Sequence, residues 1–301
     1  MRIIVFDVGN AACSVVTSPN GYGMMIDCGS HGEKSDPVDL VKSNTEWLGL
    51  NPYTTSSGEN YPLGLLHITH PDEDHVRNSK NIKENLTPYL LHRTKSEEYP
   101  KDENIPDDYL TYLDKRYRGS NGEKIDWGFE INRSFSIPME ILKSEDNFKG
   151  KIKNNSSNLR YIKFNGISIL FCGDIEEEGW NWLLNNDSTF VATISSGINV
   201  LIASHHGHKS GYSKALFDKI GNVDVVIHSK ASEANIEGSD VSTQYSQHAN
   251  GVYYKSLGNE GGVYEGKVLT TRSNGGIYIY ANEELGLKLW ADKASSNHRK
   301  I

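Results

Sequence analysis

Three apolar segments of the chain end directly in residues that can bind a metal ion, and no other feature restricts the fold as strongly. The segments are "LGLLHIT" (63–69), "ISILFCG" (167–173) and "NVLIAS" (199–204). The residues that follow them are His70, Asp174 and the pair His205–His206. Short apolar runs bounded by Gly, Asn and Pro are typical of buried β-strands. Because side chains at strand ends can meet at one rim of a sheet, the three segments predict a polar cluster there.

Similar short runs recur in both halves of the chain and indicate two sheets. They are "RIIVFDV" (2–8), "SVVT" (14–17), "GMMID" (23–27), "LRYIKF" (159–164), "VDVVIHS" (223–229) and "GGIYIYAN" (275–282). Asn165-Gly166 predicts a two-residue hairpin turn, and Asp36 and Ser213 are expected to cap helices. Strands and helices in this order fit two sheets packed face to face and covered by helices, as a single α/β domain over 1–301.

Residues 77–150 have a different composition, rich in Lys, Glu, Asp, Asn and Tyr, and one helix is expected over 107–118. We predict an inserted helical segment that forms a lid over the cluster; a solvated helical excursion is the alternative. The tail from about residue 293 is expected to be frayed. The three cysteines are widely spaced and are expected to be buried without forming disulfides.

The first cluster places four ligand-type side chains within six positions, at His70, Asp72, Asp74 and His75. Imidazole nitrogen and carboxylate oxygen are both ligands of divalent metal ions. In an extended chain, residues 70, 72 and 74 would share one face; in a loop, they could surround one ion and leave His75 for a second. A solvated acidic loop with coincidental histidines is the other interpretation. The cluster therefore favours a metal centre with two sites.

The two later clusters indicate a metal site only in combination with the first. Asp174 by itself would be an ordinary helix cap, but its two oxygens could also bridge two metal ions. His205, His206 and His208 lie around Gly207 just after a strand. This arrangement suits contact with a metal or a phosphate; a His-rich surface turn is the alternative.

Together these motifs resemble those of the metallo-β-lactamase superfamily, and more closely those of the hydrolase domain of ComEC-type DNA-uptake proteins. The motifs are H-x-D-x-D-H at 70–75, Gly-Asp at 173–174 and His-His-Gly at 205–207. The flanking segments "FDVGNA" (6–11), "MIDCG" (25–29) and "TTRSNGGIYIY" (270–280) are also similar. The resemblance spans nearly the whole chain and implies a four-layer αββα sandwich of the metallo-β-lactamase type, with a metal centre on the sheet rim.

The resemblance also implies a ligand set for two divalent ions, Zn²⁺ or Mn²⁺. One ion would be held by Asp74, His75 and His206, and the other by His70 and Asp72, with Asp174 as a bridge. Asp27 would orient these ligands without binding a metal. Which member of the pair His205–His206 is the ligand stays open. No His occurs from Arg93 to Cys172, where many members of the superfamily carry a further ligand; the competence branch lacks it too.

The same resemblance implies a metal-dependent phosphodiesterase or nuclease that cleaves DNA or RNA with a hydroxide activated by two metal ions. The catalytic residues would be Asp74, Asp174 and His205. Substrate contacts could come from residues near the same strand ends, namely His205, His208, Lys209 and His248. A hydrolase of a small phosphodiester, a cyclic nucleotide or a lactone is the first alternative. A component of a multi-protein system, such as a defence system, that uses the site for regulation is the second.

The net charge of −8 argues against a surface covered with nucleic-acid contacts. A local basic strip could still hold a phosphate backbone, although an ordinary exposed face is an equal interpretation. Its residues are Lys143, Lys149, Lys151, Lys153, Arg160 and Lys163. No segment approaches the roughly 20 apolar residues that span a bilayer, and the N-terminus lacks the features of a secretory signal. We therefore expect a cytoplasmic protein without membrane contact, whose partner is nucleic acid or a small phosphodiester.

Overall fold

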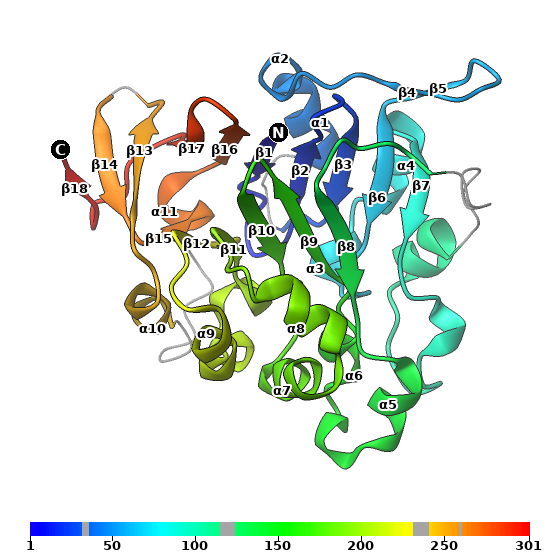
Figure 1. Ribbon diagram of the computed structural model, residues 1–301. Helices are drawn as coiled ribbons and strands as arrows, with labels where there is room; N and C mark the ends of the chain where they lie inside the picture. The colour runs from blue at the N-terminus through cyan, green and yellow to red at the C-terminus, as the bar shows by residue number, and fades with distance from the viewer. Residues whose placement is uncertain (32–35, 115–123, 231–240, 259–260) are drawn as a thin grey trace.

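The computed structural model describes residues 1–31, 36–114, 124–230, 241–258 and 261–301. Two β-sheets pack face to face, and helices cover their outer faces (Figure 1). Within the described residues the first sheet has ten strands, in the order β18-β14-β13-β17-β16-β1-β2-β3-β6-β7. The second has six described strands, in the order β15-β12-β11-β10-β9-β8. The expected four-layer αββα sandwich is confirmed.

The first sheet is built from both ends of the chain. Its N-terminal strands are β1 (Arg2–Val5), β2 (Ser14–Thr17), β3 (Gly23–Ile26), β6 (Leu63–His67) and β7 (Pro88–His92). Its C-terminal strands are β13 (Val252–Ser256), β14 (Val263–Gly266), β16 (Ile277–Asn282), β17 (Gly286–Ala291) and β18 (Arg299–Lys300). β1 pairs with β16 in antiparallel orientation, whereas β3, β6 and β7 run parallel. The parallel pairing brings the residues after β3 and β6 to one rim.

The second sheet supplies the other half of that rim. Its strands are β8 (Ile131–Phe135), β9 (Leu159–Phe164), β10 (Ile167–Phe171), β11 (Val200–Ile202), β12 (Val225–His228) and β15 (Val268–Thr270). β9 and β10 form the predicted hairpin, and both turn residues, Asn165 and Gly166, have positive φ. β10, β11, β12 and β15 run parallel, so the residues that follow each of them emerge at the same edge.

The helices are short, and the predicted caps begin two of them. They are α1 (Pro37–Ser43), α2 (Thr45–Leu48), α3 (Glu73–Val76), α4 (Ser79–Asn85), α5 (Met139–Ser144), α6 (Ile152–Asn155), α7 (Glu177–Asn186), α8 (Ser188–Ile194), α9 (Lys214–Ile220), α10 (Ser242–Gln247) and α11 (Thr271–Asn274). The Asp36 side chain accepts from the Val38 N–H, and the Ser213 hydroxyl accepts from the Leu216 N–H. Within the described part of the chain, none of the helices has the length and apolarity needed to cross a membrane.

Smaller elements complete the described secondary structure. Strands β4 (Tyr53–Thr54) and β5 (Asn60–Tyr61) form a hairpin outside the two sheets. The 3₁₀ turns and the single π turn are η1 (Ser96–Glu98), η2 (Tyr109–Leu113), η3 (Asp146–Phe148), η4 (Ser204–Gly207) and η5 (Lys209–Gly211), of which η2 is the π turn.

Both faces of the central strands are buried, which makes the sandwich a rigid frame for its rim. In β1, Ile3 and Val5 belong to the same buried cluster as Ile169 of the opposite sheet, whereas Ile4 belongs to the cluster that contains Val38 of α1. Full burial of such a side chain stabilises the fold by about 1.5–3 kcal/mol. The three cysteines are buried and free, as expected.

The segment 77–150 differs from the predicted helical insertion. In its described residues it contains β7 and β8, which are edge strands of the two sheets, so it is not purely helical. Within the helix expected over 107–118, residues 107–113 are helical, with Tyr109–Leu113 as a π turn, and residues 115–118 lie outside the described residues. A role as a lid stays a prediction. The tail expected to fray from about residue 293 is instead ordered, because β18 pairs with β14.

Candidate metal centre

The four candidate ligands after β6 lie in a loop and in the short helix α3, not in an extended strand. They are His70, Asp72, Asp74 and His75. The segments that follow β1 and β3 hold this loop through the backbone. The Ala12 N–H donates to the Asp74 carbonyl at 3.0 Å, and the Cys28 N–H donates to the His75 carbonyl at 2.8 Å. The loop therefore wraps its side chains around a common point.

The His-His-Gly motif after β11 forms a turn with little freedom. His205 and His206 have φ values of 50° and 54°, in the left-handed region that non-glycine residues seldom adopt. A Cβ at Gly207 would lie 2.2 Å from the His228 ring, so this position requires glycine. The His205 N–H donates to the Gly173 carbonyl at 3.0 Å, which fixes the turn beside Asp174.

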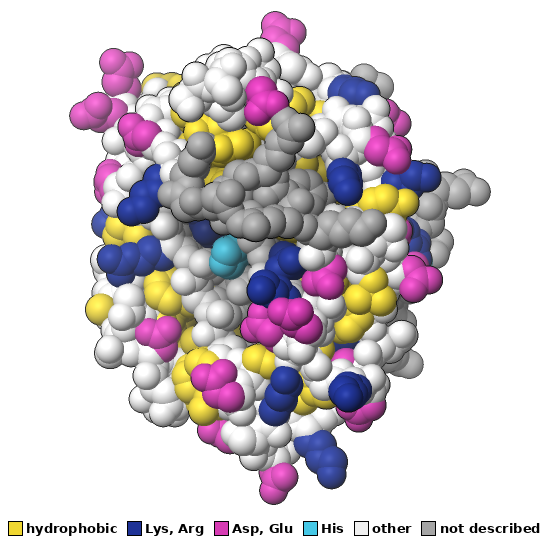
Figure 2. Space-filling model, turned by 90° about the vertical axis from the view of Figure 1, so that its right-hand side faces the viewer, with side chains coloured by type: hydrophobic (Ala, Val, Ile, Leu, Met, Phe, Trp, Pro, Cys, Tyr) yellow, Lys and Arg dark blue, Asp and Glu magenta, His cyan; other side chains and the backbone are white. Residues whose placement is uncertain are grey.

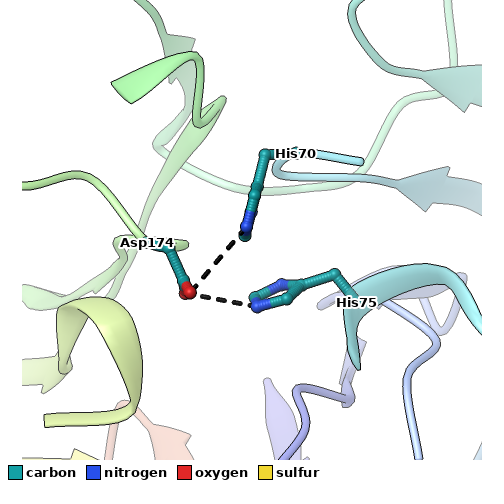
Figure 3. A group of neighbouring side chains, drawn as sticks. All are labelled: His70, His75 and Asp174. Atoms are coloured by element: carbon teal, nitrogen blue, oxygen red, sulfur yellow. Dashed lines mark ion pairs between the residues drawn. The ribbon is translucent and has the colours of Figure 1, made fainter. Parts of the chain in front are cut away.

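The carboxylate of Asp174 lies at the centre of four imidazole rings. Its Oδ1 is 3.2 Å from His75 Nε2. Its Oδ2 is 3.8 Å from His70 Nε2, 3.7 Å from His206 Nε2 and 3.8 Å from His205 Nε2. Figure 3 shows Asp174 with the two rings contributed by the first cluster. Residues from three distant parts of the sequence therefore meet at the rim, as the strand ends predicted.

Two groups of side chains have ligand atoms close enough to share a metal ion. The first group is His70, His75 and Asp174, and the second is Asp74, His75 and His206. Within each group all ligand atoms lie within 4.8 Å of one another. In the second group His206 Nε2 is 3.1 Å from Asp74 Oδ2 and 3.3 Å from His75 Nε2. This group is the set that the resemblance implied for one ion.

Asp72 lies at the margin of the first group and is shared with a lysine. Its Oδ2 is 3.5 Å from His70 Nε2, while its Oδ1 accepts from Lys153 Nζ at 2.5 Å. Sequence analysis placed Lys153 in a basic strip and gave no sign of this pair, because 81 residues separate the partners. The compact first group therefore contains His75 where the resemblance implied Asp72.

Hydrogen bonds behind the ligands fix which ring nitrogen faces the cluster. His75 Nδ1 donates to Asp27 Oδ2 at 2.8 Å, and His206 Nδ1 donates to the Ser229 carbonyl at 2.6 Å. Asp27 also accepts from the backbone N–H and the hydroxyl of Thr69, each at 2.8 Å. Both histidines are thereby left with Nε2 directed at the cluster. Asp27 lies behind His75, in the position that the resemblance implied; Thr69 and Ser229 were not predicted.

The charges of the cluster balance one another. Burial alone would lower the pKa of His75, but the carboxylates of Asp174 and Asp27 raise that pKa well above its ordinary value. Burial would likewise raise the pKa of Asp174, but His75 and His206 hold it well below its ordinary value. Without a metal, protons on the imidazoles supply the positive charge that these carboxylates need. Metal binding would displace those protons, so affinity should rise with pH.

The residues present fit a divalent cation. His70 Nε2 is buried and makes no hydrogen bond within the described residues, an arrangement that costs about 1–3 kcal/mol when nothing compensates it. A small cavity of about 30 Å³ is bordered by His75, Asp174 and His206. Imidazole and carboxylate donors suit both Zn²⁺ and Mn²⁺. These residues could therefore hold a metal ion.

Three of the predicted substrate-binding residues lie beside the ligands, on their more exposed side. His205 Nδ1 is 2.8 Å from the Ser210 hydroxyl, and His208 Nδ1 is 2.9 Å from the same hydroxyl. Lys209 directly follows His208 in sequence and is exposed. Glu176 Oε1, which sequence analysis did not single out, is 3.6 Å from His205 Nδ1. Of the pair of adjacent histidines, His206 belongs to a compact ligand group and His205 does not.

The structure does not bring His248 to the rim. Its carbonyl accepts from the Val223 N–H, before the start of β12, whereas the rim lies at the other end of that strand. The His248 ring stacks on Phe217 with centroids 4.4 Å apart, and its Nε2 is 2.9 Å from the Tyr212 hydroxyl. His248 therefore packs in the helical layer, and its predicted role in substrate binding has no support from its position.

Three of the six residues of the predicted basic strip are paired or buried. Lys151 pairs with Glu178 at 2.5 Å and with Glu176 at 3.6 Å, and Lys153 pairs with Asp72. Arg160 is buried. On the face drawn in Figure 2, the described Lys and Arg side chains alternate with Asp and Glu. Neither these paired or buried residues nor the mixed charges on that face provide a continuous row of cations for a polyanion.

A second pair of histidines, the buried His67 and the partly buried His92 of the edge strand β7, does not join the metal centre. His67 Nε2 donates to the Asn158 carbonyl at 2.8 Å, and His67 Nδ1 is 3.0 Å from His92 Nδ1. Burial, aided by His92 and Arg160, lowers the pKa of His67 well below its ordinary value. Burial also lowers the pKa of His92, to about 4. Both rings are therefore held neutral in the folded protein.

This pair predicts a loss of stability in mild acid. In the unfolded state the His92 imidazole binds a proton near pH 6.5, whereas in the folded state it does so only near pH 4. The free energy of unfolding therefore falls as the pH drops below 6.5. We expect a His92 contribution of about 2 kcal/mol between pH 7 and pH 5. Urea unfolding of the chelator-treated protein and of His92→Asn measures it: the wild type should lose about 2 kcal/mol more than the variant. Equal losses would contradict the assignment. His75 and His206 contribute to folding stability with the opposite pH dependence, and this contribution is the same in the wild type and in the variant.

The fold and the rim define a class of protein: a four-layer αββα sandwich whose rim carries side chains that could hold divalent metal ions. No protein-family model matches the chain. The chain is similar to ComE operon protein 3 of Bacillus subtilis, with 25% identity over 224 residues. The match covers 73% of this chain and 27% of that protein, so the chain spans about a quarter of its length.

Similar solved structures include three from bacteria. The metallo-beta-lactamase fold protein YhfI from Bacillus subtilis has 10% identity and a TM-score of 0.38, covering 76% of this chain and 86% of that one. A putative Zn-dependent hydrolase of the metallo-beta-lactamase superfamily from Thermotoga maritima has 12% identity and a TM-score of 0.38, covering 89% and 97%. Zn²⁺-bound PqqB from Methylobacterium extorquens has 13% identity and a TM-score of 0.36, covering 67% and 70%.

Proposed function

We propose that the protein is a metal-dependent hydrolase of phosphodiester bonds that acts on nucleic acid. The observation that carries this proposal is the buried Asp174 carboxylate, which lies 3.2–3.8 Å from the Nε2 atoms of four histidines. Two divalent ions bound there would lower the pKa of a bound water and neutralise charge on the attacked oxygen. The resemblance to the hydrolase domain of competence proteins supports a nucleic-acid substrate over other esters.

Residues of the chain would orient the ligands, hold the phosphate and transfer a proton. His75 and His206 keep Nε2 aimed at the cluster because their Nδ1 protons are held by Asp27 and by the Ser229 carbonyl. His205 lies outside the compact ligand groups, with Nδ1 beside the Ser210 hydroxyl. Its Nε2 is thus placed to hold a phosphate oxygen or to give a proton to the leaving oxygen.

A nuclease assay with matched substrates tests this function. The protein would be incubated with Mn²⁺ or Zn²⁺ and single-stranded DNA, duplex DNA, RNA or bis-p-nitrophenyl phosphate. We expect cleavage of nucleic acid that disappears in a chelator and falls at least about 100-fold in His205→Ala. Asp218→Asn, on the exposed face of α9, is the control that should retain full activity.

The outcomes separate the proposed function from its alternatives. Cleavage of only the small ester would favour a hydrolase of small phosphodiesters or cyclic nucleotides. Metal binding without hydrolysis of any substrate would contradict the proposal and favour the regulatory use of the site within a larger assembly.

A further inference from the structure

A cavity of about 800 Å³ lies on the C-terminal side of the metal centre. Its walls come from β14, β15, β18, α10 and α11, which lie on the left in Figure 1. Most of the lining consists of hydroxyl, amide and cationic side chains. A concave site of this size is typical of ligand binding rather than of core packing.

The charge of this cavity opposes that of the protein. Four cationic side chains line it, and Glu265 is its one carboxylate among the described residues; the cations are Lys230, Lys267, Arg272 and Arg299. The whole chain carries a net charge of −8. Lys267 and Arg299 are exposed, and neither takes part in an ion pair within the described residues. These two exposed cations in an acidic protein would attract anions.

The cavity wall is joined to the metal centre through the end of β12. His206 Nδ1 donates to the carbonyl of Ser229, and the next residue, Lys230, lines the cavity. The Lys230 N–H donates to the Thr271 hydroxyl at 3.0 Å, and that hydroxyl donates to the Lys230 carbonyl at 3.2 Å. Two consecutive residues therefore connect a candidate metal ligand to the cationic wall.

We propose that this cavity binds backbone phosphates of a single-stranded nucleic acid whose neighbouring bond lies at the metal centre. This inference rests on the proposed function and names its substrate class. Lysine and arginine contacts with phosphates supply most of the sequence-independent affinity for nucleic acids. A few unpaired nucleotides fit a concave site of about 800 Å³. A duplex presents its phosphates on a convex surface, so we expect it to fit this concavity less well than a single strand.

Binding in the absence of metal tests the inference without depending on catalysis. Fluorescence anisotropy would follow a short labelled DNA strand with the full chain in a chelator, at several salt concentrations. We expect Lys267→Gln with Arg299→Gln to weaken binding about tenfold at low salt and to lower the salt slope by about 0.7 per lost phosphate contact. Lys255→Gln with Lys288→Gln is the control pair, at exposed positions of β13 and β17. Its affinity should stay within about twofold of the wild type, because these charges lie away from the bound DNA.

Two competitors identify the source of the phosphates. Duplex DNA of the same length and tripolyphosphate should each compete at least about tenfold more weakly than the single strand. Equal competition by tripolyphosphate would overturn the assignment to a strand. No binding in chelator, or equal losses in the test and control pairs, would overturn the cavity as a site. Cleavage assays on the same proteins keep the two proposals distinct: a cavity that binds DNA in a protein that cleaves nothing refutes only the proposed function.

Discussion

Replacing Asp174 with asparagine should abolish tight binding of divalent metal ions while the sandwich stays folded. The substitution preserves shape but removes a negative charge that lies within 4 Å of four imidazoles. It also exchanges a carboxylate oxygen for an amide nitrogen that cannot act as a ligand. Loss of a residue that merely orients a ligand costs about 10–100-fold in metal affinity. We therefore expect at least about 100-fold for this central group, and a corresponding loss of hydrolysis.

Isothermal titration with Mn²⁺ and Zn²⁺ measures this effect directly. Asp218→Asn is the matched control, because Asp218 pairs with Lys214 on the exposed face of α9, at 2.6 Å. Circular dichroism should show both variants folded. An affinity of Asp174→Asn within tenfold of the control, on the order of ordinary surface effects, would show that Asp174 is not part of a metal centre.

Replacing Gly29 with alanine should disrupt the metal loop although residue 29 holds no ligand. A Cβ at this position would lie 1.6 Å from the Asp74 carbonyl oxygen, which is backbone and cannot rotate away. The same carbonyl accepts the Ala12 N–H, so any shift also breaks that hydrogen bond. Overpacking in a well-packed interior costs about 1–3 kcal/mol, and we expect about 3 kcal/mol or more here. Because Asp74 and His75 move with the loop, metal affinity should fall as well.

Gly58→Ala provides the control for this prediction. A Cβ at Gly58 meets open space, and the positive φ there costs about 1 kcal/mol without reference to the rim. Urea unfolding and metal titration of both variants separate the effects. If Gly29→Ala were no less stable than Gly58→Ala and bound metal normally, the close approach of these two backbone segments would be refuted.

The sequence was informative wherever the signal is local. The Asn165-Gly166 hairpin and the caps at Asp36 and Ser213 depend on neighbouring backbone groups, so residue type alone predicts them. The convergence of His70, Asp174 and His206 followed from one topological fact: each comes just after a strand that ends at the same rim.

Features that depend on contacts between distant residues could not be predicted from the sequence. β7 and β8 are edge strands whose outer residues are partly exposed, so their apolar pattern is weak. The tail from about residue 293 was expected to fray, but its pairing with β14, which its own composition does not reveal, orders it. The pairing of Lys153 with Asp72 links residues far apart in the chain. His248 was assigned to the rim from nearness to a strand, but it lies at the strand's start rather than at its end.

The central claim is that the rim holds divalent metal ions between the two ligand groups. Anomalous diffraction at the manganese edge from crystals grown with Mn²⁺ tests it most directly. We expect two peaks that flank the Asp174 carboxylate, one toward His70 and one toward Asp74 and His206. Well-ordered crystals grown in excess Mn²⁺ with no anomalous peak among these side chains would contradict the claim.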